Sequence, residues 1–231
     1  ARDIALGIDG FELYRERELT DLIQNDDGVE ITVQAPDGSR ETHRGRFLIG
    51  ADGGRSVVRK SLDIDFPGFT WPERFIIVST YYDFEEAAGY RYRNYVAHPE
   101  QWCAMIKVPG EHSEGIWRAL FPAFGDAPDE HVLSDEWIQA RFAECYPYDP
   151  PYDLVHRNLY SVHQRVAASF AKGRVALAGD AAHVNNPLGG MGMNSGIHDG
   201  LNLAKKLEEA WHGGGHEALL VAEEPARRVR R

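Results

Sequence analysis

Residues 173–196 read GRVALAGDAAHVNNPLGGMGMNSG, and this stretch decides the fold. Residues 175–178 are an uninterrupted apolar run, which is typical of a central strand in a parallel sheet because such a strand is buried on both faces. Gly179 and Asp180 end the run, and a glycine-rich loop leads into a helix predicted over 193–211. Apolar residues recur along this helix at spacings of three and four and predict one buried stripe: Met193, Ile197, Leu201, Ala204, Leu207 and Trp211.

The position of Asp180 predicts a ligand site. The strand delivers this carboxylate to the carboxyl edge of a parallel sheet, where open α/β sheets bind ligands and where it can accept hydrogen bonds from a polyol. Four glycines between 189 and 196 leave the backbone uncovered, so a flat ligand can approach its N–H groups. Those groups lie at the start of the helix, whose partial positive charge favours an anionic or electron-rich ring edge.

A second stretch, residues 48–59, reads LIGADGGRSVVR. A short apolar strand ends in Asp52 and Gly53, and Ser56 is placed to cap a brief helix that runs to residue 62. Upstream, an alternating run at 29–33 and the pair Asp37-Gly38 predict a hairpin. Asp-Gly pairs are common turn formers, so taken alone Asp52-Gly53 fits a plain turn as well as a binding site.

Together the two stretches resemble motifs of the class A (p-hydroxybenzoate-hydroxylase-like) FAD-dependent aromatic monooxygenases, in the same order along the chain. The resemblance implies that Asp180 bonds the ribityl chain of FAD, and that Pro187 and the backbone of 190–194 follow the pyrimidine edge of the isoalloxazine. It links Asp52-Gly53 to the flavin pyrophosphate and the nicotinamide cofactor, and His183 is interpreted as a positioning residue. The implied cofactor-binding residues are Asp52, Gly53, Arg55, Gly179, Asp180, Pro187, Gly189, Gly190, Met191, Gly192, Met193 and Asn194.

The resemblance also implies a reaction. NADPH or NADH reduces FAD, O₂ adds to give a flavin C4a-hydroperoxide, and a phenolic or other aromatic substrate is hydroxylated. A ubiquinone-pathway hydroxylase or a halogenase stays open, although the Trp-rich motif usual in halogenases is absent, and so does a non-catalytic fragment unable to hold FAD. No catalytic base can be named, and no metal site is predicted because no two histidines show the HxxxH spacing inside a predicted helix.

The predicted fold class is α/β, with a partial FAD-binding Rossmann-like domain and an inserted, mostly antiparallel β-sheet substrate domain. Residues 1–62 and 166–231 form the two parts of the first domain, and residues 63–165 form the second. Complete family members begin with a βαβ unit whose GxGxxG holds the ADP pyrophosphate. The glycines at 190–195 do not supply it, because about ten residues separate them from their strand. With no other GxGxxG and no Met before Ala1, the sequence predicts an N-terminally truncated chain.

The inserted domain is rich in aromatic and β-branched residues. Its candidate strands are 75–82, 90–97, 102–108 and 116–121, and a helix capped by Ser134 interrupts them. The resemblance sets this sheet opposite the reactive edge of the flavin, as a surface for a planar phenolic ring. The pocket candidates are Tyr81, Tyr95, His98, Trp102 and Arg118. Ordinary sheet packing explains each of them equally well.

Composition limits the partners. The chain has 25 Lys and Arg against 36 Asp and Glu, a formal charge of −11, which disfavours binding to nucleic acid. Its apolar runs are far shorter than the roughly 20 residues that cross a bilayer. Cys103 and Cys145 are too few for a disulfide framework and indicate thiols in the cytoplasm. The expected partners are a small aromatic substrate and O₂, with a homodimer left open.

Overall fold

A computed structural model describes residues 2–97, 102–110, 115–123, 125–148, 151–187 and 190–214. The chain divides into two compact units, Ala1–Gly68 with Gln164–Arg231, and Phe69–His163. The sequence predicts divisions at 62/63 and 165/166, and the roles predicted for the two units stay predictions. The described residues combine helices, antiparallel sheets and the parallel pair of β4 and β11, so the predicted α/β class is confirmed.

Two long strands, β5 (Gly68–Thr80) and β9 (Leu154–Val166), carry the chain between the units. The other elements of the first unit are α1 (Arg2–Ala5), β1 (Glu18–Gln24), β2 (Val29–Gln34), β3 (Arg40–Gly45), β4 (Leu48–Gly50), α2 (Val57–Ser61), β10 (Ala171–Lys172), β11 (Val175–Leu177), η1 (Gly179–Ala181), β12 (His183–Val184), α6 (Met191–Glu209) and η3 (Ala210–Gly214). Those of the second unit are α3 (Phe84–Ala88), β6 (Arg93–Val96), β7 (Cys103–Val108), β8 (Ile116–Ala123), α4 (Asp129–Val132) and α5 (Asp135–Cys145).

The first unit contains two small sheets. Strands β1, β2 and β3 form an antiparallel meander, and the predicted hairpin between β2 and β3 is confirmed, with Gly38 at φ 84°. The second sheet has the order β10-β11-β4, in which β11 pairs parallel to β4 and antiparallel to β10. All three residues of β11 are buried, as its apolar sequence predicts.

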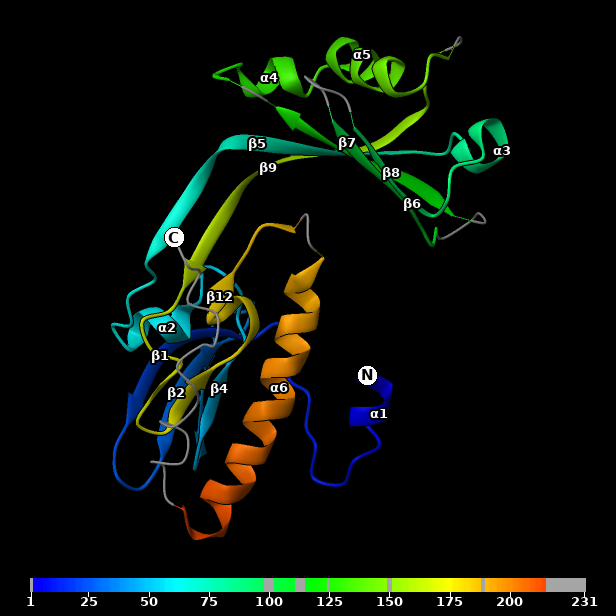
Figure 1. Cartoon of the computed structure of the whole chain (residues 1–231). Coiled ribbons are helices and arrows are strands. Elements are labelled where there is room, and N and C mark those ends of the chain that lie inside the picture. The colour runs from blue at the N-terminus through cyan, green and yellow to red at the C-terminus, as the bar shows by residue number, and fades with distance from the viewer. Residues whose placement is uncertain are drawn as a thin grey trace. The chain divides into compact units, whose positions relative to one another are not determined.

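Helix α6 packs against this second sheet, mainly through residues outside the predicted stripe (Figure 1). Its buried residues are Ser195 and Leu203, whereas Met193, Ile197, Leu201 and Trp211 are exposed. The predicted stripe is therefore wrong at these four positions, whereas Leu207 is half-buried and packs against the sheet. One physical reason is close packing at the start of the helix, where a Cβ added to Gly196 would lie only 3.5 Å from the Cα of Gly179. Further along, Leu203 and Leu207 fill the contact, whereas Met193, Ile197 and Leu201 lie outside it.

Glycine is required where β5 begins. Gly68 has φ 145°, and a Cβ there would lie 2.0 Å from the carbonyl oxygen of Gln164 and 2.7 Å from the Cα of Arg165. Strand β9 therefore passes so close to Gly68 that no side chain fits.

In the second unit, helices cover one face of an antiparallel sheet (Figure 1). The full strand order is β12-β9-β5-β8-β7-β6, in which β12 pairs with the end of β9 that belongs to the first unit. The core between sheet and helices includes Trp117, Phe121, Ile138 and Phe142, all at most 2% exposed. Ser134 accepts a hydrogen bond from the amide of Trp137 and caps α5, as predicted.

Asp83 ties α3 to the sheet. Its carboxylate accepts hydrogen bonds from the amide of Glu85 at 2.8 Å, from Trp117 Nε1 at 3.3 Å and from Lys107 Nζ at 3.2 Å. Burial alone would raise the pKa of Asp83, but these donors outweigh it and hold the pKa below its ordinary value of 3.8.

The two cysteines, both free thiols, lie side by side in the second unit. Cys103 Sγ on β7 is 2.8 Å from Cys145 Sγ at the end of α5. The hydrogen bond between them raises the pKa of Cys103, which burial raises further, and lowers the pKa of Cys145.

Among the described helices, none has both the length and the apolar character needed to cross a membrane.

Candidate functional site

The pairing of β4 with β11 brings the two glycine-containing motifs together. Leu48 lies opposite Val175 and Gly50 opposite Leu177, and the amide of Ala178 donates to the carbonyl of Gly50 at 3.0 Å. Because the pair is parallel, both strands end at the same edge of the sheet. The loop of Asp52-Gly53 and the turn of Gly179-Asp180 therefore start side by side, although about 125 residues separate them.

A buried arginine links the two loops. Arg59, on α2 and 4% exposed, donates from Nη1 to the carbonyl of Ala181 at 2.7 Å and from Nη2 to the carbonyl of Gly54 at 2.8 Å. Its guanidinium lies 3.7 Å from the ring centre of Phe66. Burial lowers the pKa of Arg59, and the negative charge of Asp52 acts in the opposite direction. Arg59 was missed from the sequence, where only its place at the end of the second motif marked it.

Asp52 caps α2. Its carboxylate accepts from Ser56 Oγ at 2.5 Å, from the amide of Val57 at 2.7 Å and from the amide of Val58 at 3.1 Å. Ser56 in turn accepts from the amide of Arg59, so the helix predicted after Ser56 is confirmed. The plain structural explanation of Asp52 therefore holds, and its predicted contact with the cofactor stays a prediction. The neighbouring Arg55 is exposed.

Asp180, unlike Asp52, caps none of the described helices. It lies on the turn η1 directly after β11, it is exposed, and no hydrogen bond joins its carboxylate to another residue in the described parts of the chain. The preceding Gly179 has φ 59°, a left-handed conformation that favours glycine.

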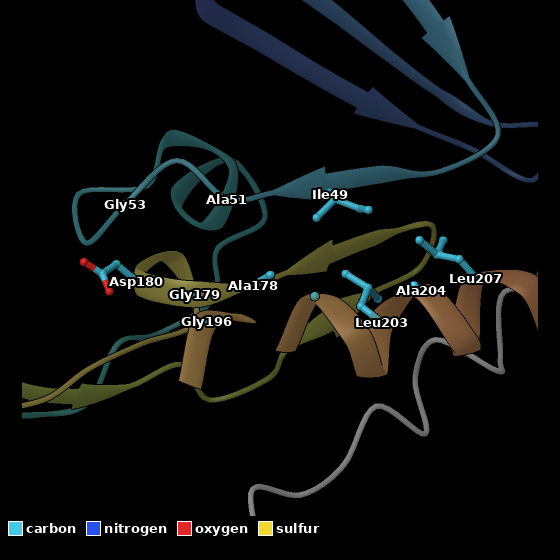
Figure 2. A pocket seen from close by; sticks show the side chains of 11 residues that line it. Ile49, Ala51, Gly53, Ala178, Gly179, Asp180, Gly196, Leu203, Ala204 and Leu207 are labelled. Atoms are coloured by element: carbon cyan, nitrogen blue, oxygen red, sulfur yellow. The ribbon is translucent and has the colours of Figure 1, made fainter. Parts of the chain in front are cut away.

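A cavity of about 490 Å³ opens beside this turn, between β4 and α6. Figure 2 shows Asp180 and Gly53 at one end of it and Leu207 at the other, with Ile49 between them. The glycine-rich end exposes backbone, and the other end is apolar, with Leu203 and Ala204 from α6.

The first turn of α6 supplies the remaining predicted residues. Gly190 precedes the helix with φ 62°, and its amide donates to the carbonyl of Pro187 at 2.9 Å. Met191, Gly192, Met193 and Asn194 form the first turn, whose amides have no partner within a helix. Gly189 lies outside the described residues.

One acid that the sequence did not mark also reaches the turn. Asp199 on α6 accepts hydrogen bonds from the amide of Gly179 and from His183. Its spacing of four residues from both Ser195 and Leu203, which are buried on the same helix, is the signal that would have found it.

Three of the predicted pocket residues in the second unit, Tyr95, Trp102 and Arg118, lie on the sheet face opposite the helices. Tyr95 pairs with Ala104 on the neighbouring strand, and Arg118 pairs with Ile106. Tyr95 and Arg118 are exposed, and Trp102 contacts Phe75 at a ring distance of 5.8 Å. Tyr81 lies just after β5 and is 50% exposed. His98 lies outside the described residues.

Residues 6–230 match the protein family described as FAD binding domain. The chain is 35% identical over 203 residues to para-nitrophenol 4-monooxygenase of Pseudomonas sp. (strain WBC-3), a match that covers 85% of this chain and 48% of that protein. The chain belongs to the family of FAD-dependent aromatic monooxygenases.

Other members support the same assignment. The chain is 32% identical over 229 residues to 3-(3-hydroxy-phenyl)propionate/3-hydroxycinnamic acid hydroxylase of Mycolicibacterium smegmatis (strain ATCC 700084 / mc(2)155), covering 98% of this chain and 39% of that one. The crystal structure of p-nitrophenol 4-monooxygenase PnpA from Pseudomonas putida DLL-E4 aligns with TM-score 0.78 and 32% identity, over 90% of this chain and 52% of that one. The flavin-dependent monooxygenase PieE, solved with FAD and substrate, aligns with TM-score 0.73 and 28% identity, over 85% of this chain and 35% of that one.

The chain thus spans about half or less of the length of the curated relatives it matches. These relatives are named as an aromatic monooxygenase and an aromatic hydroxylase, and neither is named as a ubiquinone-pathway hydroxylase or a halogenase. The predicted family and fold are confirmed.

Proposed function

We propose that the protein is an FAD-dependent monooxygenase that hydroxylates a phenolic or other aromatic substrate, with NADH or NADPH and O₂ as co-substrates. One observation carries this proposal. Asp180 lies on the turn that follows the buried strand β11, at the rim of a glycine-lined cavity. Its carboxylate is exposed and has no hydrogen-bond partner among the described residues. A carboxylate accepts hydrogen bonds only, so it suits the row of hydroxyls on a ribityl chain.

The space around the turn fits this half of FAD. A Cβ built on Gly53 or on Gly190 would meet no atom within 4 Å, so the backbone there is open to a ligand. The amides that begin α6 face no helical partner and favour an electron-rich ring edge. The residues that we propose to contact FAD are Asp52, Gly53, Arg55, Gly179, Asp180, Pro187, Gly189, Gly190, Met191, Gly192, Met193 and Asn194.

FAD, when bound, supplies the electron transfer and the activation of O₂. The chain's own residues bind and orient it. Asp180 accepts hydrogen bonds from the hydroxyls of the ribityl chain, and the first amides of α6 face the isoalloxazine ring. Arg59 holds the Gly54 and Ala181 loops at a fixed spacing through its two hydrogen bonds. We assign no residue as a catalytic base.

We propose that the substrate is a planar aromatic ring held on the exposed sheet face of the second unit. The printed names of the relatives, a nitrophenol monooxygenase and a hydroxyphenylpropionate hydroxylase, support a phenolic compound. Tyr95 and Trp102 offer aromatic surface, and Arg118 on the same face offers a cation for an acidic group.

We also propose a cytoplasmic, homodimeric protein. The two free thiols at 2.8 Å support a reducing compartment. The exposed apolar side chains of α6 (Met193, Ile197, Leu201) support contact with a second copy, because apolar patches mark interaction sites. Sedimentation of the purified protein tests the assembly.

Flavin titration tests the cofactor part of this proposal. We expect the wild-type chain to quench the fluorescence of added FAD or riboflavin, and Asp180→Ala to weaken binding at least tenfold. Asp27→Ala, which removes an exposed acid from the same unit, serves as the control and should bind like wild type. A wild-type chain that binds neither flavin contradicts the proposal.

Substrate-dependent NAD(P)H oxidation tests the reaction. A flavin-loaded protein whose NADH and NADPH oxidation stays the same with and without every phenolic compound tried is not an aromatic hydroxylase.

A further inference from the structure

The carboxylate of Asp199 lies at the junction of α6 and the Gly179-Asp180 turn. Its Oδ2 accepts a hydrogen bond from the amide of Gly179 at 3.0 Å and another from His183 Nε2 at 2.7 Å. The side chains of Asp199 and His183 are only 20% and 14% exposed. Hydrogen bonds with a charged acceptor and limited access to water are the stronger kind.

These two bonds give the Gly179 amide and the His183 ring nitrogen an acceptor within the described parts of the chain. The amide of Ala178 donates to the carbonyl of Gly50 on β4, and successive amides of a strand point to opposite edges, so the amide of Gly179 points away from β4. Asp199 supplies the missing acceptor from a different element. Loss of that acceptor would leave a partly buried N–H without its protein partner, which loosens the turn.

His183 is itself held in place. Its ring stacks on Phe170 at 5.8 Å between ring centres and 22° between planes, and β12, which carries it, pairs with β9. On the other side, α6 approaches the turn so closely that a Cβ on Gly196 would lie 3.5 Å from Gly179 Cα. The turn is therefore held by β11, by Arg59 through Ala181, and by α6, from which Asp199 bonds to both Gly179 and His183.

We propose that Asp199 is a positioning residue for flavin binding. Its carboxylate holds the Asp180 turn at a fixed place on α6, so that Asp180 and the first turn of the same helix keep the spacing that one flavin requires. Asp199 lies about two helical turns after Met191 and does not line the cavity. It therefore acts through its bonds to Gly179 and His183 and not by contact with the ligand. This inference rests on the proposed function, because it assumes that Asp180 and α6 share a flavin.

The test compares three variants on α6. Asp199→Ala removes both hydrogen bonds, Asp199→Asn keeps one neutral oxygen that can accept them, and Glu208→Ala removes an exposed acid from the same helix as a control. Two readouts are needed: hydrogen exchange of the Gly179 amide in the flavin-free protein, and the dissociation constants for riboflavin and FAD. Amides of β2, in the same unit, provide an internal reference for overall stability.

We expect Asp199→Ala to speed exchange at Gly179 at least tenfold relative to β2 and to weaken flavin binding by about 10- to 100-fold, since each orphaned donor is worth roughly a factor of ten. Asp199→Asn should give intermediate values in both measurements, and Glu208→Ala should match wild type. The Asn variant keeps the test decisive if the Ala variant does not fold.

Two results overturn the proposal. Unchanged exchange at Gly179 in both Asp199 variants would show that the bond does not hold the turn. Faster exchange with wild-type flavin affinity would show that the bond is structural only. If the wild-type protein binds no flavin, the proposed function fails and this role with it, whereas a protected Gly179 amide would still report the contact itself.

Discussion

We expect Arg59→Met to lower the free energy of unfolding of the first unit by more than any substitution at an exposed position of α2. The guanidinium donates to two carbonyls, on Ala181 and Gly54, and lies over the ring of Phe66. Each hydrogen bond from a charged donor contributes about 1.5–3 kcal/mol, and a desolvated cation–ring contact adds roughly 2 kcal/mol. Part of this sum is offset because the variant no longer has to desolvate a charge, so we expect a net loss of about 3 kcal/mol.

Urea unfolding curves measure this loss. Lys60→Met removes a neighbouring, exposed cation and should change the free energy of unfolding by less than about 0.5 kcal/mol. Arg59→Lys keeps the charge but lacks the planar fork that reaches both carbonyls, so its effect should fall between the two. If Arg59→Met and Lys60→Met agree within about 0.5 kcal/mol, the link between the loops does not stabilise the fold.

Three further predictions concern packing and titration. Gly50→Ala should destabilise the protein by about 1–3 kcal/mol in urea unfolding, because the new Cβ would lie 2.7 Å from Val58 Cγ1; an unchanged midpoint refutes the close contact. Asp83→Ala should cost about 1 kcal/mol at neutral pH through loss of the α3 cap. Since hydrogen bonds outweigh burial and lower the pKa of Asp83, that difference is present above 3.8 and should vanish as the pH falls through the lowered value; a difference that persists in acid contradicts it. Cys145, whose pKa is lowered by its bond with Cys103, should react with iodoacetamide at lower pH than an ordinary thiol, while Cys103 stays protected; peptide mapping that finds equal rates would rule this out.

The parts of the fold that depend on neighbouring residues could be predicted from the local sequence. The apolar run that became β11, the caps at Ser56 and Ser134 and the turn at Gly38 were all predictable, because each follows from a few consecutive side chains. The parallel pairing of β4 with β11 was predictable only through the resemblance to a family.

Contacts between distant residues were not predictable in this way. Arg59 reaches Ala181 across 122 positions, and no local pattern indicates such a partner. The stripe predicted on α6 is wrong at four positions for a related reason: periodicity groups apolar residues, but it does not show that the helix approaches Gly179 at Gly196 and turns Leu203 and Leu207 to the sheet. Asp52 shows a further limit, because a carboxylate that caps a helix and one that holds a ligand have the same sequence signature.

The close approach at Gly68 bears on how this protein can be recombined with its relatives. The second unit is one continuous insertion, residues 69–163, and the chain leaves the first unit at Gly68 and re-enters it at Gln164. A chimera that exchanges this insertion therefore needs only two crossover points, next to Gly68 and next to Gln164. These two residues contact each other, and a side chain at position 68 would clash with β9 at Gln164 and Arg165. Grafts that retain Gly68 and Gln164 are expected to leave the loops around Asp180 unchanged while they replace the sheet face that we propose for the substrate.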